Sequence, residues 1–170
     1  MKTVPLVIIG SARQPGDTHA WVARALAGID HRTLDLHDYV LYPYNYAEQY
    51  PADDAFPRLI QQLLEHEVLV LATPVYWYAM SAPMKVFFDR FTELTSIYKT
   101  VGKQLKGKRV LLLAVGSDRD LPLGFEVPFA STARYFGMDY RGCLYLSIKH
   151  PPAPDLLSAA VADFTRKLTD

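Results

Sequence analysis

Short apolar runs alternate along the chain with longer segments in which apolar side chains recur every three or four positions. A continuous apolar run is typical of a strand covered on both faces of a sheet, and the longer period is typical of a helix with one buried face. This pattern predicts five strands, at residues 4–10, 32–36, 68–72, 109–115 and 140–148. It also predicts five helices, at residues 18–27, 54–66, 84–98, 128–136 and 155–168.

Strands and helices that alternate in this way form a parallel sheet with right-handed crossovers and helices on both faces. Two strand orders are common for such sheets, and the loop after the first strand helps to choose between them. Residues 10–16, Gly-Ser-Ala-Arg-Gln-Pro-Gly, match neither the Gly-x-Gly-x-x-Gly loop of dinucleotide-binding domains nor the Gly-x-x-x-x-Gly-Lys-Ser/Thr loop of nucleoside triphosphatases. We therefore predict an α/β, flavodoxin-like fold: a single domain, residues 1–170, with a five-stranded parallel sheet in the order 2-1-3-4-5 and helices on both faces.

The amino-acid composition argues against several classes of binding partner. With 170 residues, of which 50% are hydrophobic and 21% charged, the chain is long enough to bury a core on both faces of a sheet. Its 18 basic and 18 acidic residues leave no basic field, so no nucleic-acid partner is expected. The single cysteine, Cys143, excludes a disulfide within this chain, and the five histidines lack ligand spacing, so no metal site is expected. No apolar run approaches the length of a membrane span, so we expect a cytoplasmic protein without a membrane partner.

The loop after the third predicted strand is one candidate binding segment. Residues 73–90 read Thr-Pro-Val-Tyr-Trp-Tyr-Ala-Met-Ser-Ala-Pro-Met-Lys-Val-Phe-Phe-Asp-Arg, in which the strand breaks at Pro74 and Pro83 opens a helix. Open α/β sheets bind ligands at the carboxyl ends of their strands, and aromatic rings with free backbone amides suit the edge of a flat conjugated ring. The alternative is a hydrophobic loop that packs beneath a neighbouring helix.

The loop after the first predicted strand, residues 11–18, is the other candidate. It supplies two hydroxyl groups, the Arg13 guanidinium and a run of backbone amides directly before a predicted helix. A helix N-terminus presents unpaired N–H groups and a partial positive charge to an anion, so the loop predicts a phosphate site. Gly16 allows a tight turn, whereas Asp17 would repel a phosphate unless it turns away. The alternative is that Asp17 or Thr18 caps the helix and that Arg13 is a solvated charge.

Together, the two loops resemble those of the NAD(P)H-dependent FMN reductases in the flavodoxin-like superfamily. The resemblance spans the chain and is strongest over residues 10–18 and 73–90. It is closest to the branch that includes the iron–sulfur flavoproteins, in which a pair like Asp53-Asp54 precedes the second helix. The segment that carries clustered cysteines in those proteins is here residues 41–46, Leu-Tyr-Pro-Tyr-Asn-Tyr, so the iron–sulfur chemistry does not carry over.

The resemblance implies FMN as the cofactor and NAD(P)H as the co-substrate. It implies that the first loop surrounds the FMN phosphate, that the second lines the isoalloxazine ring, and that a third loop, after the fourth strand, completes the site. The residues concerned are Ser11, Arg13, Gly16, Asp17 and Thr18 in the first loop, Pro74, Val75, Tyr76, Trp77 and Tyr78 in the second, and Gly116, Ser117 and Asp118 in the third. No side chain is predicted to be catalytic, because the cofactor carries the redox chemistry.

Three classes of function stay open at this point. The first is an FMN-dependent NAD(P)H oxidoreductase that passes electrons to a small acceptor such as a quinone or free flavin. The second is a flavodoxin-type electron carrier, against which the neutral charge balance counts, because carriers dock through a complementary field. The third is a flavodoxin-like interaction module without a cofactor.

One long segment is unusually aromatic, with tyrosines at positions 39, 42, 44, 46 and 50. Its central part, residues 42–50, is called the tyrosine loop here and is expected to be a subunit contact, a movable active-site lid or a self-packed loop. A homodimer or homotetramer is expected. Lys85 and Asp89, four positions apart on a predicted helix, are expected to form a surface ion pair rather than to contact the cofactor.

Overall fold

Five parallel strands form the centre of the molecule in a computed structural model, which describes residues 4–169. They lie in the order β2-β1-β3-β5-β6 and correspond one to one to the five predicted strands, so the predicted flavodoxin-like order is confirmed. A further short strand, β4 (Ala79–Met80), pairs antiparallel with β3. The parallel strands are β1 (Leu6–Ile9), β2 (Arg32–Asp35), β3 (Val68–Tyr76), β5 (Arg109–Gly116) and β6 (Asp139–Ser147).

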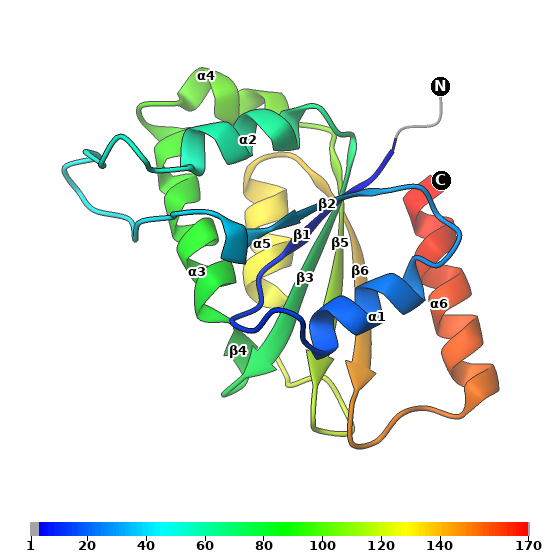
Figure 1. The fold of residues 1–170 in the computed structure, drawn as a ribbon. Coiled ribbons are helices and arrows are strands. Elements are labelled where there is room, and N and C mark those ends of the chain that lie inside the picture. The colour runs from blue at the N-terminus through cyan, green and yellow to red at the C-terminus, as the bar shows by residue number, and fades with distance from the viewer. Residues whose placement is uncertain (1–3, 170) are drawn as a thin grey trace.

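Helices cover both faces of the sheet (Figure 1). The helices α1 and α6 pack on one face, and α2, α3 and α5 pack on the other. Their bounds are α1 (Asp17–Ala25), α2 (Phe56–Leu64), α3 (Ala82–Asp89), α5 (Val127–Tyr135) and α6 (Pro154–Thr169). The short 3-10 helix η1 (Leu36–Asp38) follows β2 and leads into the tyrosine loop.

Successive residues of each central strand enter two separate cores, because side chains alternate across a sheet. In β1, Leu6 and Ile8 face the core beneath α2, α3 and α5, whereas Val7 and Ile9 face the core beneath α1 and α6. All four are at most 3% exposed, and burying each side chain contributes about 1.5–3 kcal/mol. Burial on both faces is the reason why these strands read as continuous apolar runs.

The single helix predicted for residues 84–98 is wrong. The chain leaves the α-helical path after Asp89 and continues as a 3-10 helix, η2 (Arg90–Thr95), followed by α4 (Lys99–Gly102) and a second 3-10 turn, η3 (Lys103–Leu105). Two charged side chains of η2, Arg90 and Glu93, are fully buried and pair with each other, so the tighter turn places both inside the protein. Apolar residues keep their helical spacing across the change from α-helix to 3-10 helix, so the sequence pattern did not indicate it.

The strand break predicted at Pro74 is also wrong. β3 continues through Pro74, which lies opposite Val115 of β5, and ends in a hairpin with β4. The two hairpin residues, Trp77 and Tyr78, have φ angles of +49° and +66°. Positive φ at both central positions is the geometry of a type I′ turn, which matches the twist of the flanking strands.

Candidate active site

The three candidate loops meet at one edge of the sheet because β1, β3 and β5 are neighbouring parallel strands. Gly10, the first residue after β1, donates its N–H to the carbonyl oxygen of Ala72 in β3 at 2.8 Å. Pro74 of β3 lies opposite Val115 of β5, directly before Gly116. The predicted site residues of all three loops are therefore brought to one edge, as the sequence predicted.

A buried chain of hydrogen bonds fixes the first loop to the second. The Ser81 hydroxyl, which caps the N-terminus of α3 by accepting the N–H of Met84 at 3.3 Å, donates to the carbonyl oxygen of Gly10 at 2.5 Å. The Ser81 N–H in turn donates to the Thr73 hydroxyl at 3.1 Å. Both side chains are fully buried, so the two loops are held as one rigid unit.

Gly10 lies where the chain passes closest to α3. A Cβ atom on Gly10 would lie 2.7 Å from Cβ of Met84, a distance that packed side chains do not allow. Since Met84 is fully buried, it has no room to move aside. The glycine is therefore required by this close approach.

The N-terminus of α1 carries no side-chain cap. Gly16 is the N-cap residue, in an extended conformation, and no side chain within residues 4–169 accepts a hydrogen bond from the first turn. The alternative in which Asp17 or Thr18 caps the helix is therefore wrong. Ser11 and Thr18 are buried in this loop, and the Ser11 hydroxyl bonds the backbone of Arg13 at 3.1–3.3 Å. The unpaired N–H groups of the first turn are thus left for another acceptor.

Arg13 and Asp17 form an ion pair at the rim of this loop, with 3.0 Å between Nη2 and Oδ2. Both side chains are more than half exposed, so the pair contributes at most about 1 kcal/mol. Asp17 thus turns toward Arg13, and part of the positive charge predicted for a phosphate is already engaged.

The hairpin at the end of β3 presents its aromatic rings to solvent. Trp77 is 93% and Tyr78 69% exposed, although both are held at positive φ, which costs a bulky residue free energy. Neither ring takes part in a core cluster among the described residues. The rings of this hairpin are therefore not packed beneath a neighbouring helix, which was the alternative to a binding segment.

Three residues that support the site were not predicted from the sequence. Tyr145 of β6 donates its hydroxyl to the carbonyl oxygen of Asp118 at 2.8 Å, and its ring packs against Gly116, where a Cβ would lie 2.6 Å from that hydroxyl. His19 of α1 bonds Asp35 at the end of β2, with 2.5 Å between Nε2 and Oδ2. These partners are distant in sequence, so no local pattern could have indicated them.

The base of the tyrosine loop is fixed to the body of the protein by Arg90. This fully buried side chain donates to both carboxylate oxygens of Asp54 at 2.8 Å and to the carbonyl oxygen of Tyr42 at 2.9 Å. It also pairs with Glu93, and its guanidinium lies 3.5 Å from the ring centroid of Tyr50. Both ends of the loop therefore contact one cation.

The pKa values of this cluster follow from its burial and pairing. Burial alone would raise the pKa of Asp54, but hydrogen bonds from Arg90 and from the Tyr42 N–H outweigh it and hold that pKa below its usual value. Burial works against the charge of Arg90, yet Asp54 and Glu93 raise its pKa above the ordinary value. Asp54 and Arg90 therefore stay ionised at neutral pH.

Hydrogen bonds also hold the tip of the tyrosine loop. The Asn45 N–H donates to the Tyr50 hydroxyl at 3.1 Å, and the Ser96 hydroxyl bonds the Glu48 carboxylate. Tyr46 is nonetheless 94% exposed and meets Tyr44 edge to face at 5.4 Å. The tyrosine loop is thus fixed to the rest of the protein at its base and exposes the ring of Tyr46. Its role as a lid or a subunit contact stays a prediction.

Comparison with known proteins identifies the family. Residues 5–126, which are more than half of the chain and include all three candidate loops, match the family model described as NADPH-dependent FMN reductase. The chain belongs to the NADPH-dependent FMN reductase family. It is accordingly an FMN-dependent NAD(P)H oxidoreductase, as the resemblance of its loops implied.

Individual relatives of this FMN reductase agree with the assignment. YwqN of Bacillus subtilis (strain 168), named as an NAD(P)H-dependent FMN-containing oxidoreductase, is 27% identical over 145 residues, with 80% of each chain covered. The solved structure of the Trp repressor binding protein from Bacillus subtilis matches with a TM-score of 0.73 at 24% identity, over 96% of this chain and 97% of that one. An NADPH-quinone reductase from P. pentosaceus matches with a TM-score of 0.66 at 18% identity, over 98% of each chain. These two structures establish the fold of the reductase.

Three further features of this FMN reductase concern its surface charges, its helices and its acidic, histidine and cysteine side chains. Lys85 and Asp89 form the expected exposed ion pair, with 2.6 Å between Nζ and Oδ1. Within residues 4–169, no helix is long and apolar enough to cross a membrane. In the same range, no three histidine, cysteine or acidic side chains are grouped closely enough to hold a metal ion.

Proposed function

We propose that this reductase holds FMN along the edge formed by the loops after β1, β3 and β5, and passes electrons from NAD(P)H to a small acceptor such as a quinone or free flavin. The observation that carries the proposal is the rigid link, through Ser81 and Gly10, between an uncapped helix N-terminus and an exposed aromatic hairpin. When bound, FMN supplies the redox chemistry that no side chain offers. The chain binds and orients it.

The first loop fits a phosphate group. We assign this role to Ser11, Arg13, Gly16 and Thr18, and to Asp17 through its backbone. The first-turn N–H groups of α1 are free of side-chain acceptors, and the helix dipole favours an anion there. A Cβ on Gly16 would lie 3.0 Å from the carbonyl oxygen of Arg13, so a larger residue would fill the turn.

The second and third loops fit a flat conjugated ring. Trp77 and Tyr78 supply exposed aromatic surface, while the β3 backbone beside them is fixed by its pairing with β4 and β5. N–H groups of the hairpin that are not used in this pairing are held in place by it and would stabilise negative charge that develops on a bound ring. We assign ring contacts to Pro74, Val75, Tyr76, Trp77 and Tyr78, and the completion of the site to Gly116, Ser117 and Asp118.

We further propose that the reductase works in the cytoplasm as a homodimer or homotetramer. Exposed apolar side chains support association, among them Leu123 in the loop after β5, which is fully exposed, and Tyr46 in the tyrosine loop. The open hairpin supports a small diffusing acceptor, since its rings are not covered by any other part of the described chain.

Anaerobic reduction tests the proposed function. Excess NADPH is mixed with the FMN-loaded protein, and NADH is used in a second sample. The absorbance of the oxidised flavin is followed over time. We expect the band to bleach and to return over many turnovers when a quinone is added. If neither nucleotide reduces the flavin within minutes while a reductase protein does so readily, the protein is an electron carrier of flavodoxin type.

The identity of the flavin is tested separately. The first loop offers room for one terminal phosphate and no second nucleotide motif is found in the sequence, so chromatography of the released cofactor is expected to give FMN. Recovery of FAD, or absence of affinity for FMN on reconstitution, would contradict the assignment.

Arg13 provides a test of the phosphate site. Its charge-assisted bond to a phosphate is worth about 1.5–3 kcal/mol but replaces an exposed ion pair worth up to about 1 kcal/mol, so Arg13→Ala should weaken FMN binding roughly 2- to 30-fold. Riboflavin, which lacks the phosphate, should bind with nearly unchanged affinity. Asp17→Asn is the matched variant and should strengthen FMN binding, because it removes a repulsive carboxylate and frees Arg13. Equal losses for FMN and riboflavin in Arg13→Ala would show that Arg13 only shapes the loop.

A further inference from the structure

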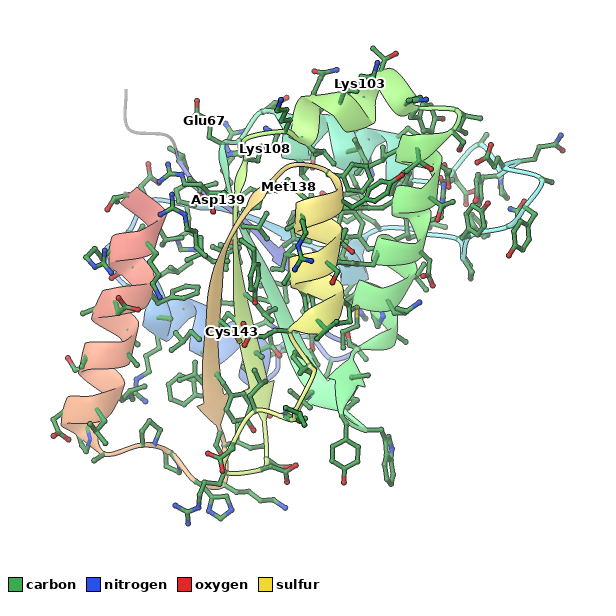
Figure 2. The ribbon with its side chains drawn as sticks, turned by 180° about the vertical axis from the view of Figure 1, so that it is seen from behind. Glu67, Lys103, Lys108, Met138, Asp139 and Cys143 are labelled. Atoms are coloured by element: carbon green, nitrogen blue, oxygen red, sulfur yellow. The ribbon has the colours of Figure 1, made fainter. Side chains whose placement is uncertain are left out.

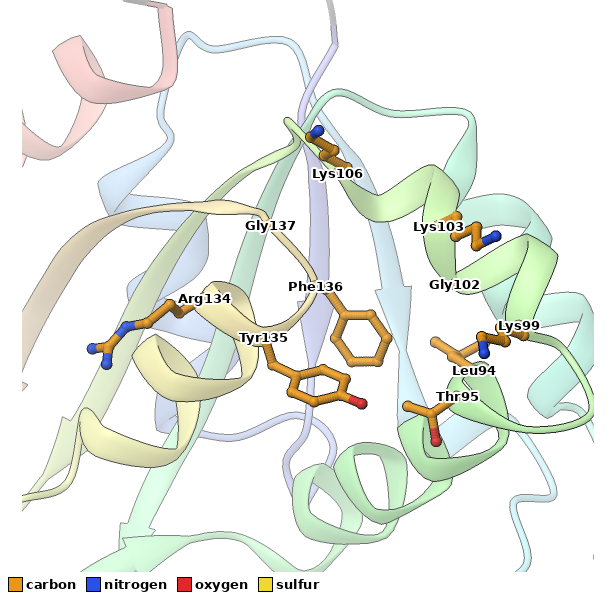
Figure 3. Close-up of a pocket in the computed structure, with 10 residues that line it drawn as sticks. All are labelled: Leu94, Thr95, Lys99, Gly102, Lys103, Lys106, Arg134, Tyr135, Phe136 and Gly137. Carbon is orange, nitrogen blue, oxygen red and sulfur yellow. The ribbon is translucent and has the colours of Figure 1, made fainter.

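A cavity lies at the opposite end of the sheet from the candidate active site. It has a volume of about 630 Å³ and opens between α4 with η3 on one side and the end of α5 on the other (Figure 3). Figure 2 shows Lys103 and Met138 at this end, away from the strand arrowheads. The volume lies within the range of roughly 300–1,000 Å³ that is usual for small-molecule sites.

The cavity is strongly basic. Its lining includes Lys99, Lys103, Lys106 and Arg134 and no acidic residue. None of these four side chains forms an ion pair with another described residue, although the whole chain carries 18 basic and 18 acidic residues. Basic side chains gathered at one hollow without acidic neighbours raise the local concentration of anions.

The walls of this basic cavity are fixed by backbone contacts. The Gly107 N–H donates to the carbonyl oxygen of Gly137 at 2.9 Å and so joins the two walls at their upper end. A Cβ on Gly102 would lie 2.2 Å from the carbonyl oxygen of Leu94, which shows how closely α4 packs on η2. The cavity is therefore preformed.

The side chains that line the cavity indicate the class of ligand. Lys99, Lys103 and Lys106 follow one another along one wall, and the rings of Tyr135 and Phe136 point toward that wall from the end of α5 (Figure 3). Tyr135 is 72% exposed, and its ring meets Phe136 edge to face at 5.1 Å. Several ammonium groups along one wall suit a ligand with several phosphate groups, and an exposed aromatic ring suits a flat base.

We propose that this basic cavity binds a small nucleotide-like polyanion, with its phosphate groups on the lysine wall and its ring against Tyr135. The Arg134 guanidinium points away from the rings in Figure 3, whereas the Lys99 ammonium points toward them, so Lys99 provides the first contact and Lys103 and Lys106 add positive charge along the same wall. The site is separate from the FMN edge and is independent of the electron acceptor used there.

Calorimetric titration of the FMN-loaded protein tests the proposal. The probes are tripolyphosphate, ATP and adenosine at low ionic strength. We expect saturable binding of ATP and of tripolyphosphate, tighter for ATP, and none for adenosine. The affinity should fall as salt is added, because exposed lysines are screened.

Matched variants locate the binding. Lys99→Gln/Lys103→Gln should weaken ATP binding at least about tenfold, since each charge-assisted bond is worth about 1.5–3 kcal/mol. The control, Lys149→Gln, removes an exposed lysine outside the cavity and should change the affinity less than about twofold. Tyr135→Ser should abolish the preference for ATP over tripolyphosphate. Reduction by NADPH should be unchanged in all three variants, which also confirms that they are folded.

Three results would overturn the proposal. The first is the absence of saturable binding of either polyphosphate below about 1 mM. The second is an equal loss of affinity in the double variant and in Lys149→Gln, which would indicate unspecific attraction. The third is sedimentation showing that the lysine variants dissociate an oligomer, because the cavity would then be covered by a second copy of the chain.

Discussion

The adjacent carboxylates Asp53 and Asp54 offer a direct test of the cluster that anchors the tyrosine loop. Asp54 is 4% exposed and accepts two hydrogen bonds from Arg90, whereas Asp53 is exposed and accepts only the Tyr42 hydroxyl, at 3.2–3.4 Å. Asp54→Asn keeps the shape and removes the charge. Asp53→Asn makes the same chemical change one residue earlier and is the control.

The expected magnitudes differ clearly. Breaking a buried ion pair by removing one partner costs about 3–5 kcal/mol, and Glu93 still compensates Arg90, so we expect about 3 kcal/mol for Asp54→Asn. For a chain of this length, that loss lowers the melting temperature by about 6–12 °C. Asp53→Asn should stay within about 0.5 kcal/mol of the parent protein.

Urea unfolding followed by tyrosine fluorescence measures both variants. Proteolysis should, in addition, cut the tyrosine loop faster in Asp54→Asn, because Arg90 then holds Tyr42 and Tyr50 less firmly. If the two variants lose the same stability, or if Asp54→Asn is as stable as the parent, the cluster does not anchor the loop and the reasoning fails.

The same cluster should make the free energy of unfolding depend on pH. The pKa of Asp54 is lower in the folded protein than in the unfolded chain, so its contribution is complete above the unfolded value of about 3.9. This stabilisation is lost as the pH falls through the lower pKa that Asp54 has in the folded protein. The difference in unfolding free energy between the parent and Asp54→Asn should therefore be constant from neutral pH to about pH 5 and shrink below about pH 4. A constant difference down to pH 2 would contradict the assigned pKa.

Two further substitutions test the frame of the active site. Tyr145→Phe removes the hydroxyl that holds Asp118 and should weaken FMN binding by about 0.5–1.5 kcal/mol, roughly 2- to 13-fold, as measured by flavin fluorescence quenching; unchanged affinity would show that this loop does not contribute. Gly10→Ala places a methyl group against Met84 and should lower stability in urea by about 1–3 kcal/mol, and an equally stable variant would mean that α3 can shift.

The sheet was predictable from the sequence because its central strands are buried on both faces. Runs such as residues 68–72 and 109–115 have no polar alternation, and only a parallel sheet between two helical layers buries such strands completely. The strand order then followed from the absence of the dinucleotide loop. The segment after Asp89 was not predictable, because apolar positions continue at helical spacing while buried charges alter the backbone.

The loops of the candidate site were predictable, but their supports were not. Glycine, proline and aromatic residues mark the loops in the sequence, since these residue types have local conformational or chemical consequences. Two of the partners of Arg90, Asp54 and Tyr42, lie 36 and 48 positions earlier in the chain, and Tyr145 reaches Asp118 across 27 positions. Long-range pairs of this kind exist only once the fold has formed.

The hairpin that carries Trp77 and Tyr78 contains a conflict between folding and ligand contact. Asparagine and glycine adopt the required backbone most readily, so Asn-Gly in place of these two residues would relax the turn and stabilise the isolated hairpin. The same exchange would remove both rings from the active-site edge. Because the rings lie outside both cores, other aromatic pairs can replace them without changing the packing of the sheet. If the hairpin contacts the ligand as proposed, exchanging its aromatic residues would change that contact while the fold is retained.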